Sequence, residues 1–141
     1  MFGIFSHDVL VKNNPITRGF DDKFMAPHSR HTGINEEDII NNPNLDLLAT
    51  SDIAGPYLIC DKSCRQIYVT GHPEYDRETL SKEYFRDVDK GLPIEVPQNY
   101  FPDDDSSRSP IFTWKSHASL LYSNWLNYFV YQNTPFDLND L

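Results

Sequence analysis

The first half of the chain alternates short apolar runs with turn residues, a pattern typical of strands joined by tight connections. Residues 4–11 are apolar and β-prone, so we predict a strand within residues 1–12. Three further apolar runs, at 45–49, 57–60 and 66–69, are separated by clusters of Ser, Asp, Gly and Pro. We therefore predict three more strands there, and we expect the last two to form a hairpin.

Residues 13–33 interrupt this pattern, because they keep neither the period of a strand nor that of a helix. They are rich in Asn, Pro, Gly, Asp and His, which predicts a long structured loop. Within it, residues 25–31 place hydrogen-bonding side chains beside apolar ones, as a ligand-contacting loop would. The alternative is that His28 and His31 tie the loop to the body of the protein through their ring nitrogens. The sequence leaves both interpretations open.

Two helices are expected around these strands. Asn35 precedes three acidic residues, which is typical of a capped helix start, and Pro43 limits this helix to about two turns. A longer helix is predicted over residues 77–90, where apolar residues recur at helical spacing. Asp76 is placed to cap its start, and Gly91 is placed to end it.

The last third of the chain predicts a loop and a closing helix. Residues 91–110 hold four prolines and an acidic run, so we expect a loop over the surface. Residues 116–132 carry an apolar and aromatic stripe at helical spacing, which is more often core than ligand site. We find no internal repeat, low-complexity tract or linker. At 141 residues with 39% hydrophobic content, the chain can bury one core, as one domain or part of one.

The charge balance narrows the classes of partner. Twelve basic residues against 21 acidic ones give a net charge of −9, which disfavours a phosphate-binding surface and therefore nucleic acid. No apolar run approaches the length that spans a bilayer, and residues 1–5 lack the basic region and cleavage site of a signal peptide. We expect a cytoplasmic protein with no membrane partner.

The two cysteines give little chemistry of their own. Cys60 and Cys64 are too few for a secreted disulfide framework, and in a reducing compartment they remain thiols. A single C-x-x-x-C without a second pair of ligands is a poor zinc signature, so we expect no metal site. We predict that Cys60 is buried and inert.

The strongest chemical signal is the segment 71–76, which reads Gly-His-Pro-Glu-Tyr-Asp between a predicted strand and a predicted helix. Histidine is the natural general base near neutral pH, and a carboxylate two residues away can orient its ring and stabilise the imidazolium. Pro73 favours extended geometry at His72, and in an extended run His72 and Glu74 project to the same side. A polar loop at the start of a helix is the more frequent reading of an isolated H-x-E.

Arg86, on the predicted helix 77–90, also has two interpretations. It lies between the faces of that helix, where it can pair with Glu83 one turn earlier. Alternatively, its guanidinium is aimed at a substrate carboxylate, which it can grip with two hydrogen bonds.

Five motifs in order along the chain resemble those of one family, the homoserine O-acyltransferases of methionine biosynthesis. They are Phe-Asp-Asp at 20–22, Ala-Pro-His-Ser-Arg at 26–30, Val-Thr-Gly-His-Pro-Glu-Tyr-Asp at 69–76, Asn-Tyr-Phe-Pro at 99–102 and Asn-Trp-Leu-Asn-Tyr at 124–128. The resemblance runs along nearly all of the 141 residues. Several motifs in the same order are far more specific than any one of them.

The resemblance implies an α/β fold, here the C-terminal portion of a three-layer sandwich similar to class I glutamine amidotransferases and flavodoxin-like proteins. It also implies a Cys-His-Glu catalytic constellation at the carboxyl ends of the strands. His72 and Glu74 match its His and Glu. In that chemistry, a cysteine takes an acetyl or succinyl group from acyl-CoA as a thioester, and the hydroxyl of L-homoserine then attacks it. Acyl-CoA is a co-substrate, and no cofactor is implied.

The same resemblance assigns two substrate-binding residues. Arg86 falls on the family's substrate-binding arginine, which suits a residue that meets the carboxylate of an amino acid. Ser29 falls on its substrate-contacting serine. The interpretation of residues 25–31 as a ligand-contacting loop is strengthened accordingly.

The chain departs from the family in length. Family members are about twice as long, so residues 1–141 look like the C-terminal half of a single domain whose N-terminal half is absent. Neither Cys60 in a predicted strand nor Cys64 in the following turn has the sharp elbow that exposes a nucleophile. The family's nucleophilic cysteine and a substrate-binding lysine would both lie before Met1. We therefore expect the missing half as a partner and little activity without it. Family members are commonly dimers, so a homodimer is also expected.

Two other functions remain open from the sequence. The chain could be a non-catalytic remnant that acts as an interaction module, because a domain cut through its sheet exposes an unpaired edge. A glutamine amidotransferase-like hydrolase shares the His-Pro-Glu arrangement, but the motifs at 99–102 and 124–128 argue against it. Acetyl is slightly favoured over succinyl as the transferred group, although no residue here decides between them.

Overall fold

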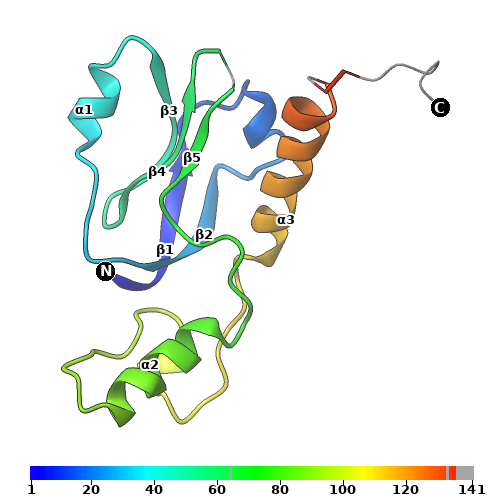
Figure 1. Cartoon of the computed structure of the whole chain (residues 1–141). Coiled ribbons are helices and arrows are strands. Elements are labelled where there is room, and N and C mark those ends of the chain that lie inside the picture. The colour runs from blue at the N-terminus through cyan, green and yellow to red at the C-terminus, as the bar shows by residue number, and fades with distance from the viewer. Residues whose placement is uncertain (64, 133, 136–141) are drawn as a thin grey trace.

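The computed structural model describes residues 1–63, 65–132, 134 and 135, and it is built on a five-stranded antiparallel sheet. The strands are β1 (Phe2–Val9), β2 (Lys23–Ser29), β3 (Leu45–Ser51), β4 (Gly55–Asp61) and β5 (Ile67–Val69), in the order β2-β1-β3-β4-β5. The helices are α1 (Glu36–Ile40), α2 (Thr79–Asp89) and α3 (Lys115–Asn124), with 3-10 turns η1 (Pro15–Thr17) and η2 (Pro102–Asp104) and a π-helical continuation of α3, η3 (Trp125–Val130). Figure 1 shows α3 beside the sheet and α2 with its flanking loops below it.

The sheet is strongly curled. β1 and β2 pair along their whole length, from Phe2 opposite Ser29 to Asp8 opposite Lys23, whereas β1 meets β3 only at Asp8 and Val9. The β1–β2 hairpin and the β3–β4–β5 meander therefore diverge from one shared corner. They meet again at the other end, where the backbone N–H of His72, just after β5, donates to the carbonyl of Pro27 in β2 at 2.8 Å. The two edges of the sheet thus come together beside residue 72.

Two groups of buried side chains hold this arrangement. The first fills the curl of the sheet under α3, and its members are Ile16, Phe24, Ala26, Leu48, Ala49, Tyr57, Leu58, Cys60 and Leu121. The second joins α2 and the long loop to the sheet, and its members are Ile4, Leu80, Tyr100, Phe101, Trp114 and Ala118. Because Ile4 lies in β1 and Ala118 in α3, the second group anchors α2 and its flanking loops, at the bottom of Figure 1, to the sheet and α3 above them.

The structure confirms most of the predicted elements. The four predicted strands are β1, β3, β4 and β5, with β4 and β5 paired as a hairpin. Asn35 caps α1 by accepting from the N–H of Glu37, and Gly91 ends α2 with a left-handed φ of 68°. Residues 91–110 form the expected loop apart from η2, and the closing helix is α3 continued by η3.

The prediction of a loop over residues 13–33 is wrong, because this segment contains η1 and the strand β2. Consecutive residues Ala26, Pro27 and His28 are all buried, so β2 shows no alternation that a sequence pattern could reveal. Pro27 is compatible with a strand here because β2 is an edge of the sheet.

The predicted start of α2 is also wrong in detail. The helix begins at Thr79, its N-cap is Glu78, and no side chain caps it. Asp76 contributes its backbone carbonyl, which accepts from the N–H of Thr79 at 3.1 Å. The chain between residue 76 and α2 is therefore a turn rather than the first turn of the helix.

Cys60 is buried in β4, 1% exposed, as predicted. Cys64 lies outside the described residues, so the prediction for that position stays open. In the part of the chain that the structure describes, no helix is both long and apolar enough to cross a membrane.

Candidate functional site

The candidate site begins with a tight turn from His72 to Tyr75. The N–H of Tyr75 donates to the carbonyl of His72 at 3.1 Å, and Pro73 occupies the second position, which its fixed φ favours. In this turn His72 Nδ1 lies 2.8 Å from Glu74 Oε1. The two side chains meet as predicted, but the predicted extended geometry is wrong, because they meet across a turn.

The ring of His72 is held in two ways. Glu74 occupies its Nδ1 edge, and the ring of Tyr75 stacks on its face, with centroids 4.4 Å apart and planes within 13°. The side chain of His72 remains 33% exposed and that of Glu74 55% exposed. When Nδ1–H donates to Glu74, Nε2 carries the free lone pair of the neutral ring, so this nitrogen can accept a proton from a reacting group.

Gly71 sets the position of this turn against the core. A β-carbon at residue 71 would lie 2.7 Å from Tyr57 Cε2 and 2.8 Å from the carbonyl oxygen of Pro27. Any side chain larger than hydrogen would therefore push the backbone away from β2 and β4. The close approach of Gly71 allows His72 to make its backbone hydrogen bond to Pro27.

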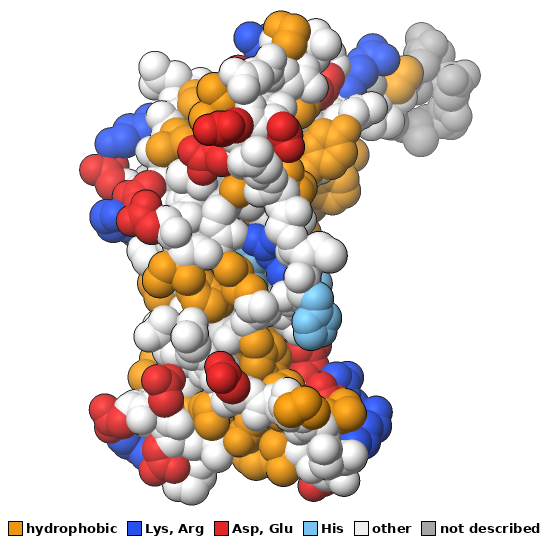
Figure 2. Space-filling model, turned by 90° about the vertical axis from the view of Figure 1, so that its left-hand side faces the viewer, with side chains coloured by type: hydrophobic (Ala, Val, Ile, Leu, Met, Phe, Trp, Pro, Cys, Tyr) orange, Lys and Arg blue, Asp and Glu red, His pale blue; other side chains and the backbone are white. Residues whose placement is uncertain are grey.

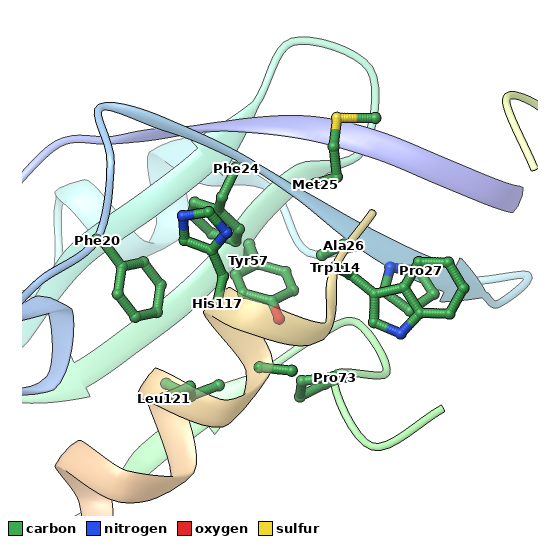
Figure 3. A pocket seen from close by; sticks show the side chains of 11 residues that line it. Phe20, Phe24, Met25, Ala26, Pro27, Tyr57, Pro73, Trp114, His117 and Leu121 are labelled. Carbon is green, nitrogen blue, oxygen red and sulfur yellow. The ribbon is translucent and has the colours of Figure 1, made fainter. Parts of the chain in front are cut away.

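His72 and Glu74 line an open groove of about 400 Å³. Its other walls are mostly apolar and come from η1, β5, α3 and η3: Ile16, Ile67, Val69, Leu121, Tyr122 and Trp125. On the core side of Pro73 lies a hollow without room for a water molecule, in which the ring of Tyr57 points toward α3 (Figure 3). That hollow is lined by core side chains, so the groove, and not this hollow, gives an external group access to His72.

Ser29 and Arg86 line a second pocket, of about 360 Å³. Ser29 ends β2 and Arg86 lies on α2, and Glu83 of α2 lines the same pocket. The structure thus brings together the two residues that the family resemblance assigned to the substrate. They lie in a pocket distinct from the groove that His72 and Glu74 line.

Arg86 is already paired with a carboxylate. Its Nε and Nη2 donate to the two oxygens of Asp87 at 2.7 and 2.8 Å, and this guanidinium lowers the pKa of Asp87. Of the two interpretations of Arg86, a carboxylate partner on its own helix is present, but the hydrogen-bonded partner is Asp87, and Glu83 interacts with Arg86 electrostatically. Since an arginine has five N–H donors, the other edge of the guanidinium can still bind a second carboxylate.

A pair of buried histidines lies behind Gly71. His7 Nε2 and His28 Nε2 are 3.0 Å apart, and both residues are fully buried. Burial lowers the pKa of His7 to about 4 and that of His28 to about 3. His28 therefore ties its segment to β1 through His7, while its Nδ1 accepts from Arg30 Nε of the same segment at 3.3 Å.

Sequence reasoning missed Tyr75 as part of the site, and it missed His7. Tyr75 had a signal in the sequence, because an aromatic residue closing a turn that starts at a histidine can stack on its ring. His7 had none, since it occupies an ordinary inward position of β1. Among the residues whose placement the structure gives, no group of three or more His, Cys, Asp or Glu could hold a metal ion.

The family model and the curated relatives that match the chain all point to one family. The family model described as homoserine O-succinyltransferase matches residues 1–136. The chain is 55% identical over 141 residues to a homoserine O-acetyltransferase of Acetivibrio thermocellus, covering 100% of this chain and 46% of the relative. It is 57% identical over 140 residues to one of Brevibacillus brevis, covering 99% and 46%. The chain spans about half the length of the curated relatives it matches.

A solved structure shares the fold. The crystal structure of SMU.1228c aligns with a TM-score of 0.57 at 18% identity, over 87% of this chain and 50% of that one. At this identity the likeness concerns the fold alone. Together with the family match, it confirms the predicted fold class, a mixed α/β fold of the glutamine amidotransferase-like type, here with a curled antiparallel sheet.

Proposed function

Because the chain belongs to the homoserine O-acyltransferase family, we propose that it supplies the base and the orienting acid for acyl transfer to L-homoserine. The observation that carries the proposal is the turn in which His72 Nδ1 lies 2.8 Å from Glu74 while the ring borders an open groove. In this arrangement the carboxylate fixes the tautomer that leaves Nε2 basic. The alternative of a polar loop that merely precedes a helix would not require this contact.

The proposed reaction has two steps. A cysteine thiolate attacks the thioester carbonyl of acyl-CoA, and CoA leaves, taking the proton that His72 had accepted from the thiol. His72 Nε2 then removes the hydroxyl proton of homoserine, whose oxygen attacks the enzyme thioester and releases the cysteine thiolate, which takes that proton back from His72. Glu74 stabilises the imidazolium formed in each step. The products are CoA and O-acylhomoserine.

We place the nucleophilic cysteine in the part of the relatives that this chain does not cover. Cys60 is unsuited to the role, because it is 1% exposed and its Sγ donates to the carbonyl of Asp61 at 3.3 Å. A nucleophile needs both exposure and a base within reach. The chain therefore works as one part of a composite active site, and it is inactive alone.

Homoserine binds in the pocket lined by Ser29 and Arg86, with its carboxylate on the outer edge of the Arg86 guanidinium. The acyl group is acetyl, since the similar curated relatives are named homoserine O-acetyltransferases. Succinyl remains the alternative, because the matching family model carries the succinyltransferase description. Assay with both donors distinguishes them.

The test joins this chain to the N-terminal part of the Acetivibrio thermocellus relative and measures O-acylhomoserine formation. We expect the joined protein to be active and His72→Ala to lower kcat by about 10²- to 10⁴-fold, the usual contribution of a general base. Glu74→Gln should give a smaller loss. Lys62→Ala, on the far turn between β4 and β5, is the control that should keep activity.

Two outcomes would contradict the proposal. Full activity in His72→Ala would remove the role given to His72. A joined protein that folds and binds homoserine but transfers no acyl group would favour the interaction-module alternative, and glutamine hydrolysis in its place would favour the amidotransferase-like one.

A further inference from the structure

Tyr75 connects the groove of His72 to the pocket of Ser29 and Arg86, and we propose that it is a positioning residue with two separable tasks. Its ring fixes the plane of the His72 imidazole, and its hydroxyl fixes Glu83 in the pocket that Ser29 and Arg86 line. This inference rests on the proposed function, in which His72 is the base and that pocket holds homoserine.

The backbone of Tyr75 is held from both sides. Its N–H donates to the carbonyl of His72 at 3.1 Å, and its carbonyl accepts from Trp114 Nε1 at 2.9 Å. Trp114 is 1% exposed and belongs to the buried group that anchors α2. The ring of Tyr75 therefore projects from a rigid support, as a residue that positions another must.

The ring acts on His72. It stacks on the imidazole at 4.4 Å, on the face, while Glu74 holds the Nδ1 edge. Glu74 fixes the rotation of the imidazole about its plane normal, and the stack fixes the plane itself. An electron-rich ring also stabilises the imidazolium that forms when His72 accepts a proton, through a cation–π interaction. His28, behind Gly71, also interacts electrostatically with His72.

The hydroxyl acts on the second pocket. It donates to Glu83 Oε1 at 2.8 Å, and Glu83 lines the pocket together with Ser29 and Arg86. Burial and this hydrogen bond raise the pKa of Tyr75, so the phenol keeps its proton and remains a donor. Without the hydroxyl, the Glu83 carboxylate would lose its fixed orientation and would lie loose beside the Arg86 side chain.

The two tasks are tested with two variants of one residue. Tyr75→Phe keeps the ring and removes the hydroxyl, whereas Tyr75→Leu removes both. In the joined enzyme we expect Tyr75→Phe to raise KM for homoserine about fivefold with kcat within twofold of wild type, since one neutral-to-charged hydrogen bond changes. Tyr75→Leu should raise KM similarly and also lower kcat about tenfold, because His72 loses its orientation.

A second measurement observes the His72 ring directly by NMR and does not depend on catalysis. In the wild-type chain of 141 residues, the stacked Tyr75 ring should shift the NMR signals of the His72 ring protons. This ring-current shift should persist in Tyr75→Phe and vanish in Tyr75→Leu.

Tyr84→Leu is the matched control. Tyr84 lies on α2, packs against the second buried group and contacts Phe85 and Phe101, so its replacement tests for general loosening of this region. Tyr84→Leu should leave the ring-current shift of the His72 ring protons at its wild-type value. The inference is overturned if Tyr75→Leu leaves the His72 resonances unchanged, or if Tyr75→Phe and Tyr75→Leu have the same kinetic effects. Failure of the proposed function would appear separately, as an inactive joined enzyme whose His72 resonances still respond to Tyr75→Leu.

Discussion

Histidines lie on both sides of Gly71, and the two sides have opposite environments. In front, His72 is 33% exposed, and a carboxylate lies 2.8 Å from one ring nitrogen while the ring borders a groove. Behind, His7 and His28 are fully buried with each other as partners. The comparison shows that the residue type alone does not make a base. A histidine can exchange protons with a reacting group only where its charged form is stabilised and accessible.

The buried pair is held in one protonation state. Because Arg30 donates to His28 Nδ1, the proton of neutral His28 lies on Nε2, and His28 then donates to His7 Nε2. This leaves the His7 proton on Nδ1, an atom without a hydrogen-bond partner among the described atoms. An additional proton would face Arg30 on one side or break the His–His bond on the other. The pair therefore supports the fold and does no acid–base chemistry near neutral pH.

The largest expected effect is a loss of stability on acidification, and it comes from the buried histidines His7 and His28. The pKa values of His7 and His28 are about 4 and about 3 in the folded chain, against about 6.5 in the unfolded chain. At a pH between the folded and the unfolded pKa of each histidine, the unfolded state therefore binds more protons than the folded state. The stability that neutral His7 and His28 contribute is complete above pH 6.5. It is lost as pH falls toward 4, by roughly 1.4 kcal/mol per pH unit for each histidine. Urea unfolding between pH 7 and 4.5 measures this slope.

A paired replacement tests the origin of that slope. Replacing both partners with apolar residues, His7→Leu with His28→Met, should flatten the pH dependence without leaving a buried donor between them. His31→Gln, at an exposed position, should keep the wild-type slope. An unchanged slope in the double variant would show that the buried pair is not its source.

The next largest effect on stability is expected from adding a side chain at Gly71, which lies between His72 and the buried histidines. Gly71→Ala places a β-carbon 2.7 Å from Tyr57 and 2.8 Å from the Pro27 carbonyl, so we expect it to lower the free energy of unfolding by about 1–3 kcal/mol. The backbone shift should also lengthen the bond from His72 to Pro27, visible as faster exchange of the His72 amide hydrogen. Gly33→Ala is the control, since its β-carbon meets only the flexible end of Arg30, at 3.4 Å. Equal stability of the two variants would refute the packing argument.

The smallest expected effect concerns the support of the His72 turn from the lower part of the molecule. Figure 2 shows that the molecule narrows between its upper and lower parts, and Trp114 bonds to Tyr75 in the core that links them. Trp114→Phe removes this hydrogen bond, so we expect a loss of about 1 kcal/mol in urea unfolding. The half-exposed Trp125, replaced by Phe, should change stability by less. If Trp114→Phe is as stable as the wild type, the hydrogen bond from the Trp114 indole to Tyr75 does not stabilise the fold.

Much of the fold could be predicted from local pattern. Strands β1, β3, β4 and β5 alternate with turn residues, and Asn35 and Gly91 mark helix ends through their own backbone preferences. Strand β2 could not be predicted, because a strand buried on consecutive positions carries no period. The helix start at Thr79 was missed because the chain from residue 72 is held by bonds to β2 and Trp114, which a capping motif does not include.

The candidate site likewise has features that could be predicted from the sequence and features that could not. The sequence by itself predicted that His72 and Glu74 meet, because the two residues are neighbours around Pro73, although it predicted an extended run where the structure has a turn. Which histidine is exposed, and that Ser29 and Arg86 share a pocket apart from His72, was decided only by the tertiary structure. These features depend on how the curled sheet brings β2, β5 and α2 together. Contacts between residues distant in sequence arise from packing, which local pattern does not record.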